Sequence, residues 1–192
     1  MCDRSPDRAD DAQRAETALK AAESGHLVLS TMHTVDAAET IGRMVEFFPG
    51  IKQQQIRSIL AGVLKGVVSQ RLLPRIEGGR VAAVELMITN SRIADLIREN
   101  KPEEISEAIG EGSFFQMQTF TQALIDLVLA DEVDREIAAN AASNRHDFLV
   151  ALEQALKRRA AGHDTATPQP EQAPDPEDEP LPELRVARPA EG

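Results

Sequence analysis

The sequence predicts an α/β fold in which helices flank a small number of strands. Apolar residues recur every three or four positions in several segments, a pattern typical of amphipathic helices. A short apolar run at residues 27–29 lies between polar residues, as in a buried strand. Two longer apolar segments flank Glu77-Gly78-Gly79. Because glycine readily adopts positive φ, this tripeptide predicts the turn of a β-hairpin.

One helix is expected before the run at 27–29. Residues 1–10 are charged and lack an apolar period, so we expect a disordered or frayed N-terminus there. Apolar residues at helical spacing then run from Ala12 to Ala22, and Gly25 stands where a helix C-cap glycine belongs. The run Leu27–Leu29 follows and is expected to be a central strand that is apolar on both faces.

Two helices are expected next. Asp36 precedes Glu39 at the spacing of a capping box, which predicts Asp36 as the N-cap of a helix over 37–48. Apolar residues at i, i+3, i+4 and i+7 predict a second helix over 56–68.

The hairpin is expected to have arms at 69–76 and 80–88, with Pro74 at a sheet edge or a bulge. The chain between the hairpin and the tail is expected to be helical. Near Gly162 proline and acidic residues replace large apolar ones, so residues 161–192 are expected to be a disordered acidic tail. The helices are expected at 91–100, 102–109, 116–130, 133–142 and 144–160.

Composition narrows the classes of partner and site. The formal net charge is −11, which disfavours binding to nucleic acid. No apolar run reaches the roughly 20 residues needed to span a bilayer, so no direct membrane insertion is expected. Cys2 is the only cysteine, which excludes a four-thiolate zinc site. His26 and His33 would lie on opposite faces of a regular strand, so no metal site is expected.

Four motifs, in order, resemble the type II/IV secretion ATPases. The segment Ala21–Thr34 is similar to a His-box with the pattern AAxTGHLVxxTLHT. Three later segments resemble the patterns SQxL, GGRVAAxEIMI and MQTL: Ser69–Leu73, Gly78–Ile88 and Met117–Phe120. The resemblance covers about residues 11–142. The patterns GGRVAAxEIMI and MQTL make the chain most similar to the type IV pilus retraction (twitching motility) ATPases.

The segment between the SQxL and GGRVAAxEIMI motifs separates two classes of these motors. The extension or secretion motors carry a four-cysteine metal subdomain there. In this sequence Arg75-Ile76 runs straight into Glu77-Gly78-Gly79, with no cysteine. This difference favours the retraction class.

The resemblance implies the C-terminal half of a RecA-like P-loop ATPase domain over 11–90 and a helical C-terminal subdomain over 91–160. It also implies that His33 is a catalytic residue close to the γ-phosphate, with Thr31 and Thr34 as nucleotide-binding residues, and that ATP and Mg²⁺ are the cofactors. From the residues alone, the other interpretation of His33 is a hydrogen-bonded loop histidine, although ligands do gather at strand ends in open α/β sheets.

A retraction motif with the pattern AIRNLIRE falls on residues 92–99. Leu96, Ile97, Arg98 and Glu99 match it, and the resemblance implies that they couple the motor to pilus retraction. Three earlier positions of the motif differ. From the residues alone, Arg98 and Glu99 would be ordinary exposed helix charges.

The nucleotide motifs of P-loop ATPases are where this sequence departs most from the family. The Walker A pattern G-x-x-x-x-G-K-[ST], whose backbone N–H groups and lysine hold the phosphates, does not occur in the 192 residues. In the Walker B region Asp11 stands for the family aspartate, while Arg8 occupies the catalytic glutamate position and Asp10 the arginine position. We therefore expect this chain to be inactive alone.

As a whole, the resemblance implies the C-terminal portion of a hexameric, ATP-hydrolysing motor for type IV pilus retraction and twitching motility. Such a motor would be cytoplasmic, and peripheral to the inner membrane through a pilus platform protein. The alternative is a non-catalytic interaction module or a non-functional remnant of such an ATPase. A free-standing hydrolase that uses His33 lacks a nucleophile constellation and is the least favoured class.

Overall fold

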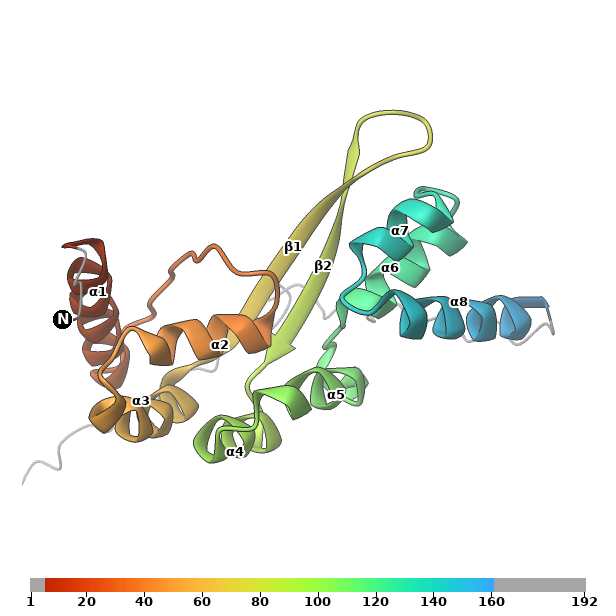
Figure 1. Ribbon diagram of the computed structural model, residues 1–192. Coiled ribbons are helices and arrows are strands. Elements are labelled where there is room, and N and C mark those ends of the chain that lie inside the picture. Colours follow the sequence, from red (N-terminus) through yellow and green to blue (C-terminus); the bar gives the residue numbers. More distant parts are fainter. Residues whose placement is uncertain (1–5, 161–192) are drawn as a thin grey trace, which may run out of the picture. The chain divides into compact units, whose positions relative to one another are not determined.

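The computed structural model describes residues 6–160, with side chains from Ala12 onward (Figure 1). Within this part, the residues up to Leu156 form one compact unit. The tail expected at 161–192 and the first five residues lie outside the described part. The helices and strands, in chain order, are α1 (Pro6–Glu23), α2 (Ala37–Glu46), α3 (Gly50–Val63), β1 (Gly66–Pro74), β2 (Arg80–Ile88), α4 (Ser91–Glu99), α5 (Ile105–Gly110), α6 (Phe120–Leu129), α7 (Arg135–Ala141) and α8 (Arg145–Ala160), with short 3₁₀ turns at Pro102–Glu104 and Ser113–Phe115.

The α/β class is confirmed in its coarse form, as helices packed around a small sheet. Strands β1 and β2 pair antiparallel, in a register that runs from Gly66 opposite Ile88 to Pro74 opposite Arg80. Gly78 and Gly79 have φ values of 93° and 79°, so the predicted glycine turn is confirmed. Among the described residues this hairpin is the whole sheet, extended only by one isolated bridge from β2 to Gln118.

The prediction of a strand at Leu27–Leu29 is wrong for this structure. These residues belong to no strand, and the side chains of Leu27 and Leu29 are 80% and 87% exposed. A strand that is apolar on both faces needs partners on both edges and cover on both faces. The described part of the chain supplies neither, so the run remains an irregular connection between α1 and α2.

The helix expected over 56–68 is half right. Helix α3 begins earlier, at Gly50, and ends at Val63, while the last predicted turn belongs to β1. Gly66 opens that strand at a point where a Cβ atom would lie 2.6 Å from the carbonyl oxygen of Met87. This close approach of the two backbones requires glycine at position 66. The chain therefore continues as a strand from Gly66, although apolar residues still recur at helical spacing.

Helix α1 begins at Pro6, so residues 6–10, expected to be frayed, belong to the helix. Proline suits the first helical position because its missing N–H would have no intrahelical partner there. At the other end, Gly25 has a φ of 91° and its N–H donates to Ala22, which confirms the expected C-cap.

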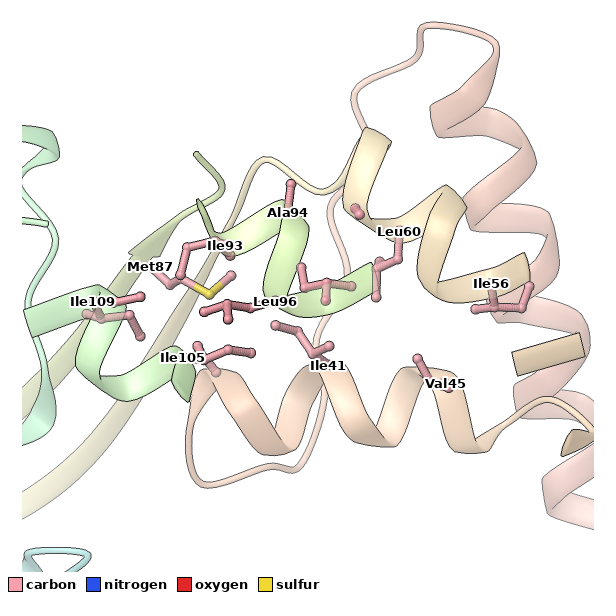
Figure 2. Close-up of a cluster of buried hydrophobic side chains, with 14 of the residues drawn as sticks. Ile41, Val45, Ile56, Leu60, Met87, Ile93, Ala94, Leu96, Ile105 and Ile109 are labelled. Carbon is pink, nitrogen blue, oxygen red and sulfur yellow. The ribbon is translucent and has the colours of Figure 1, made fainter. Parts of the chain in front are cut away.

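A first hydrophobic cluster lies between α1, α2, α3, α4 and α5 and the start of the hairpin. Figure 2 shows Ile41 of α2, Leu96 of α4 and Ile105 of α5 pointing toward one another in its centre. Each large apolar side chain buried in this way contributes about 1.5–3 kcal/mol. The cluster joins residues from both sides of position 90, where a domain boundary was expected, and that boundary stays a prediction.

A second hydrophobic cluster lies between the turn end of the hairpin and α6, α7 and α8. Phe148 and Leu152 of α8 are fully buried in it, together with Leu124 of α6. The hairpin contributes Leu73 of β1 and Ala83 of β2, whose side chains lie on the same face of the sheet. The hairpin thus contributes to both clusters. Among residues 6–160, no helix has both the length and the apolar character that a membrane crossing requires.

Candidate functional site: the connection between α1 and α2

Residues 24–36 connect α1 to α2 and carry the three residues expected to face a nucleotide. At the start, the N–H groups of Gly25 and His26 donate to carbonyls of the last turn of α1, at 3.0 and 3.1 Å. His26 also shares a 2.9 Å hydrogen bond with Ser24 Oγ. At the other end, Asp36 caps α2. Residues 27–35 are therefore held at one end by α1 and at the other end by α2.

Thr31 and His33 are exposed, and Thr34 is partly buried. Thr34 Oγ1 lies 2.6 Å from Thr40 Oγ1 on α2, so its hydroxyl is engaged with the helix rather than with His33. Thr31 and His33 present a hydroxyl and an imidazole at the surface, both of which can donate to phosphate oxygens. The structure therefore places the three residues on one short segment but does not bring their polar atoms into contact.

The start of α2 is held by a variant of the predicted capping box. Asp36 accepts a hydrogen bond from the Glu39 N–H at 2.8 Å, as expected. Glu39 does not bond back to the N-cap residue: its Oε2 accepts from the N–H of Val35, one residue earlier, at 2.9 Å. The side chain of Glu39 thereby fixes the backbone next to Thr34.

Glu85 of β2 lies beneath this helix start and is 4% exposed. Its Oε1 accepts a hydrogen bond from the N–H of Ala37 at 2.8 Å. Burial raises the pKa of Glu85, and the charge of Asp36 acts in the same direction, while backbone N–H groups and the positive charge of Arg71 oppose it. The net upward shift means that burial outweighs the donors around this carboxyl group.

Arg71 of β1 joins the same segment to α6 and α7. Its guanidinium donates to the carbonyl of Val35 at 3.3 Å, to the carbonyl of Ala141, and to Ser143 Oγ at 3.3 Å. The same group lies over the ring of Phe120, 4.3 Å from the centroid. A planar guanidinium can donate in several directions and stack at the same time, which a lysine cannot do.

The four residues expected to couple the motor lie on α4 and divide into two pairs. Leu96 and Ile97 are 6% and 2% exposed and belong to the first hydrophobic cluster. Arg98 and Glu99 are exposed, and form ion pairs with Asp95 at 2.6 Å and with Lys101 at 2.8 Å.

Neighbours of the Arg98 side chain line a shallow, open depression of about 450 Å³ between the end of α3 and α4. Lys65, Asn90 and Asp95 lie on its wall with Arg98. Arg98 is also tied to α3 through its backbone, because its carbonyl accepts from Gln54 at 3.2 Å. The backbone of Arg98 is therefore linked to α3, whereas the side chain of Thr34 is linked to α2.

Sequence reasoning singled out neither Glu85 nor Arg71. A signal existed for Glu85. In a strand, residues two apart share a face, so Glu85 falls on the side of Ala83 and Met87, which are buried. A charged residue in such a row points to a buried, partnered group. Arg71 shares this face once the hairpin register is known.

The described residues do not fit a complete site for ATP and Mg²⁺. Phosphates need a set of convergent N–H groups and a lysine, and Mg²⁺ is usually bound through carboxylates. Within the part that the structure describes, no group of three or more His, Cys, Asp or Glu side chains could hold a metal ion. Thr31 and His33 supply donors without a glycine-rich phosphate loop beside them. These two residues therefore do not form a complete catalytic site by themselves.

Comparison with known proteins agrees with the four motifs. The Type II/IV secretion system protein family matches residues 9–161. The chain is 43% identical over 138 residues to the type IV pilus retraction ATPase PilT of Pseudomonas aeruginosa, a match that covers 72% of this chain and 40% of that protein. It is also 43% identical over 128 residues to the twitching motility protein of Neisseria gonorrhoeae, covering 66% of this chain and 34% of that protein.

A solved structure gives the same result in three dimensions. The crystal structure of the pilus retraction motor PilT with bound ADP aligns with a TM-score of 0.61 and 46% identity, over 69% of this chain and 37% of that one. The matches thus span 34% to 40% of the length of these relatives. From the motifs, the fold and these matches together, the chain belongs to the Type II/IV secretion system protein family and is similar, within it, to the pilus retraction ATPases.

Proposed function

We propose that this chain is the C-terminal portion of a hexameric motor that hydrolyses ATP to retract type IV pili and so drives twitching motility. The motor would be cytoplasmic and would act at the inner membrane through a pilus platform protein. The observation that carries the proposal is the 43% identity over 138 residues to a retraction ATPase, together with the His-box and hairpin motifs that resemble this class.

In this proposal Thr31, His33 and Thr34 face the phosphates of ATP, with His33 close to the γ-phosphate. The exposure of Thr31 and His33 supports the role, because a nucleotide-facing side chain must be open to a ligand from outside this segment. The remaining parts of the site, which would hold the phosphates and Mg²⁺, are not supplied by the described residues. The chain alone is therefore inactive toward ATP in this proposal.

The role proposed for α4 is to couple the nucleotide state to pilus retraction. Leu96 and Ile97 would seat the helix in the first hydrophobic cluster, and Arg98 and Glu99 would present charges at the surface. The division into a buried and an exposed pair supports this assignment, because an element that passes on movement needs both an anchor and a contact surface.

The second candidate is a non-catalytic interaction module or a non-functional remnant of such an ATPase. It is favoured by Arg8 and Asp10, which stand where relatives of this class carry a glutamate and an arginine. The two candidates differ in whether residues 9–161 can replace the matching part of an active motor.

The test is a chimera in which residues 9–161 replace the matching segment of the Pseudomonas aeruginosa retraction ATPase, produced in cells that lack their own enzyme. The proposal predicts restored twitching zones, and predicts that the same chimera with His33→Gln restores none. A chimera that accumulates to the level of the parent enzyme without restoring twitching would favour the interaction module or remnant.

A further inference from the structure

The inward face of the hairpin is apolar except at three positions. Leu73, Ala83 and Met87 on this face are 2% exposed or less. The polar exceptions are Arg71 and Glu85, and Ser69, which pairs with Glu85 across the strands. Arg71 and Glu85 come from neighbouring strands on the same side, and the charge of Arg71 acts on Glu85. Opposite charges inside a protein are retained only where each has partners.

Glu85 lies near two helix starts. Its carboxylate accepts from the N–H of Ala37, the first residue of α2, at 2.8 Å. The backbone N–H of Phe120, the first residue of α6, also acts on this carboxyl group and opposes the upward shift of its pKa. The first-turn N–H groups of a helix have no partner within the helix and favour negative charge. Glu85 therefore ties the start of α2 to β2 and interacts with the start of α6.

Arg71 links the same two regions by separate contacts. On one side it donates to the carbonyl of Val35, next to the segment Thr31–Thr34. On the other it donates to the carbonyl of Ala141 and to Ser143, at the end of α7, and lies over the Phe120 ring. The contacts cross 36 and 70 positions of sequence. Apart from these two side chains, the hydrogen bonds described above for residues 24–36 run to α1, to α2 or within the segment.

We propose that Arg71 and Glu85 are positioning residues that couple the Thr31–Thr34 segment to helices α6 and α7. The assignment of these threonines and His33 to a nucleotide rests on the proposed function. A ligand that draws the segment toward itself would then pull on Val35 and Ala37, and through the two side chains shift the helices. By reciprocity, a change at α6 or α7 would alter how the segment is held.

A merely structural pair would behave differently from a coupling pair. If Arg71 only adds stability, loss of the Phe120 ring should leave the exchange of the Val35 and Ala37 amides unchanged once global stability is corrected for, although the two side chains are in contact. If Arg71 transmits a change at Phe120 to the segment, Phe120→Leu should have no further effect on the segment once Arg71 has been replaced. A double-mutant cycle distinguishes these two cases.

The experiment measures hydrogen exchange of the Val35 and Ala37 amides in the 192-residue chain without nucleotide. The variants are Arg71→Lys, which keeps the charge and loses the planar fork, Phe120→Leu, which loses the ring, and the pair together. Arg71→Lys loses the hydrogen bond to the Val35 carbonyl, which loosens the segment. The Val35 and Ala37 amides should then exchange about threefold to tenfold faster. Phe120→Leu should also accelerate exchange there, and the double variant should exchange no faster than Arg71→Lys.

Arg75→Lys, alone and with Phe120→Leu, is the matched control. Arg75 lies just beyond β1 and forms an ion pair with Glu132 at 3.1 Å. The effects of Arg75→Lys and Phe120→Leu on amide exchange should therefore be additive. Rates are compared after correction for the unfolding midpoint of each variant, so a global loss of stability does not imitate coupling.

A second variant keeps the test informative if Arg71→Lys folds poorly. Glu85→Gln has one acceptor oxygen in place of two, which weakens the acceptor at the start of α2, and exchange at Ala37 should rise about threefold to tenfold. Additive effects in the cycle, or unchanged exchange at Val35 and Ala37 in both variants, would overturn the coupling. Either result leaves the ATP proposal intact, because no nucleotide is present.

Discussion

The backbone N–H of Ala37 donates to Oε1 of Glu85 across 2.8 Å, although the two residues are 48 positions apart in sequence. This hydrogen bond fixes the first turn of α2 on the inward face of the hairpin. The residues expected to face a nucleotide end three positions before Ala37. Their backbone is therefore held by a buried side chain of β2 as well as by the N-cap of α2.

The buried carboxyl group of Glu85 predicts a dependence of stability on pH. Because burial raises the pKa of Glu85, the folded chain holds this proton more tightly than the unfolded chain. The stability that the proton contributes is present below the ordinary glutamate pKa of about 4.3 and is lost as pH rises through the raised pKa of the folded state. Glutamine does not ionise, so the Glu85→Gln variant lacks this loss.

The measurement is urea unfolding of the parent chain and of Glu85→Gln between about pH 4 and 8. The difference in free energy of unfolding, parent minus variant, should fall steadily as the pH rises. A difference that stays constant, or that grows with pH, would show that the folded state does not favour the protonated carboxyl group.

Removing the N-cap of α2 should weaken the chain measurably. Asp36→Ala leaves the N–H of Glu39 without its acceptor and is expected to lower the free energy of unfolding by about 1 kcal/mol. Asp95→Ala is the control, since Asp95 has an exposed side chain with one ion pair on the surface of α4, and should change the free energy by less than about 0.5 kcal/mol. Equal losses in the two variants, measured by urea unfolding, would contradict the capping role.

The two pairs on α4 should separate folding from coupling. Leu96→Ala removes a buried side chain from the first hydrophobic cluster and is expected to cost about 2–5 kcal/mol. Glu99→Ala should leave the unfolding midpoint unchanged and, in the chimera with the Pseudomonas aeruginosa enzyme, reduce twitching while ATP hydrolysis continues. If Glu99→Ala twitches like the parent chimera, the exposed pair has no part in coupling.

The exposed apolar run before His33 predicts that the isolated chain self-associates. Leu27 and Leu29 are 80% and 87% exposed in a segment that belongs to no strand, and such a segment can pair with another chain. Changing both to glutamine should shift the chain toward a monomer in size-exclusion chromatography with light scattering. Ile51→Gln, which alters a single apolar side chain that is 94% exposed on α3, should not. A parent chain that is already monomeric would contradict the prediction.

Local signals in the sequence predicted much of the fold. Gly78 and Gly79 marked the hairpin turn, Gly25 marked the end of α1, and Asp36 marked the start of α2. Each of these depends on the conformation or hydrogen bonding of a few neighbouring residues, which sequence spacing reports directly. The helices after the hairpin were located for the same reason.

Features that depend on distant partners could not be predicted in this way. Leu27–Leu29 has the composition of a buried strand, but a strand also needs neighbours, and the described residues provide none. Val67 and Val68 continue the helical spacing of α3, yet pairing with β2 places them in a strand. The two-sided contacts of Arg71 depend on a register that brings β1 beside the end of α7, so its sequence neighbours did not reveal them.

The central claim is that residues 9–161 form the C-terminal part of an ATP-hydrolysing retraction motor, with His33 at the nucleotide. Phosphate release by the purified chimera, in which these residues replace the matching segment of the Pseudomonas aeruginosa retraction ATPase, tests it most directly. We expect ATP-dependent release by the chimera, loss of most of that release in the His33→Gln chimera, and none by the 192-residue chain alone. A folded, assembled chimera that releases no phosphate, or one that is unaffected by His33→Gln, would contradict it.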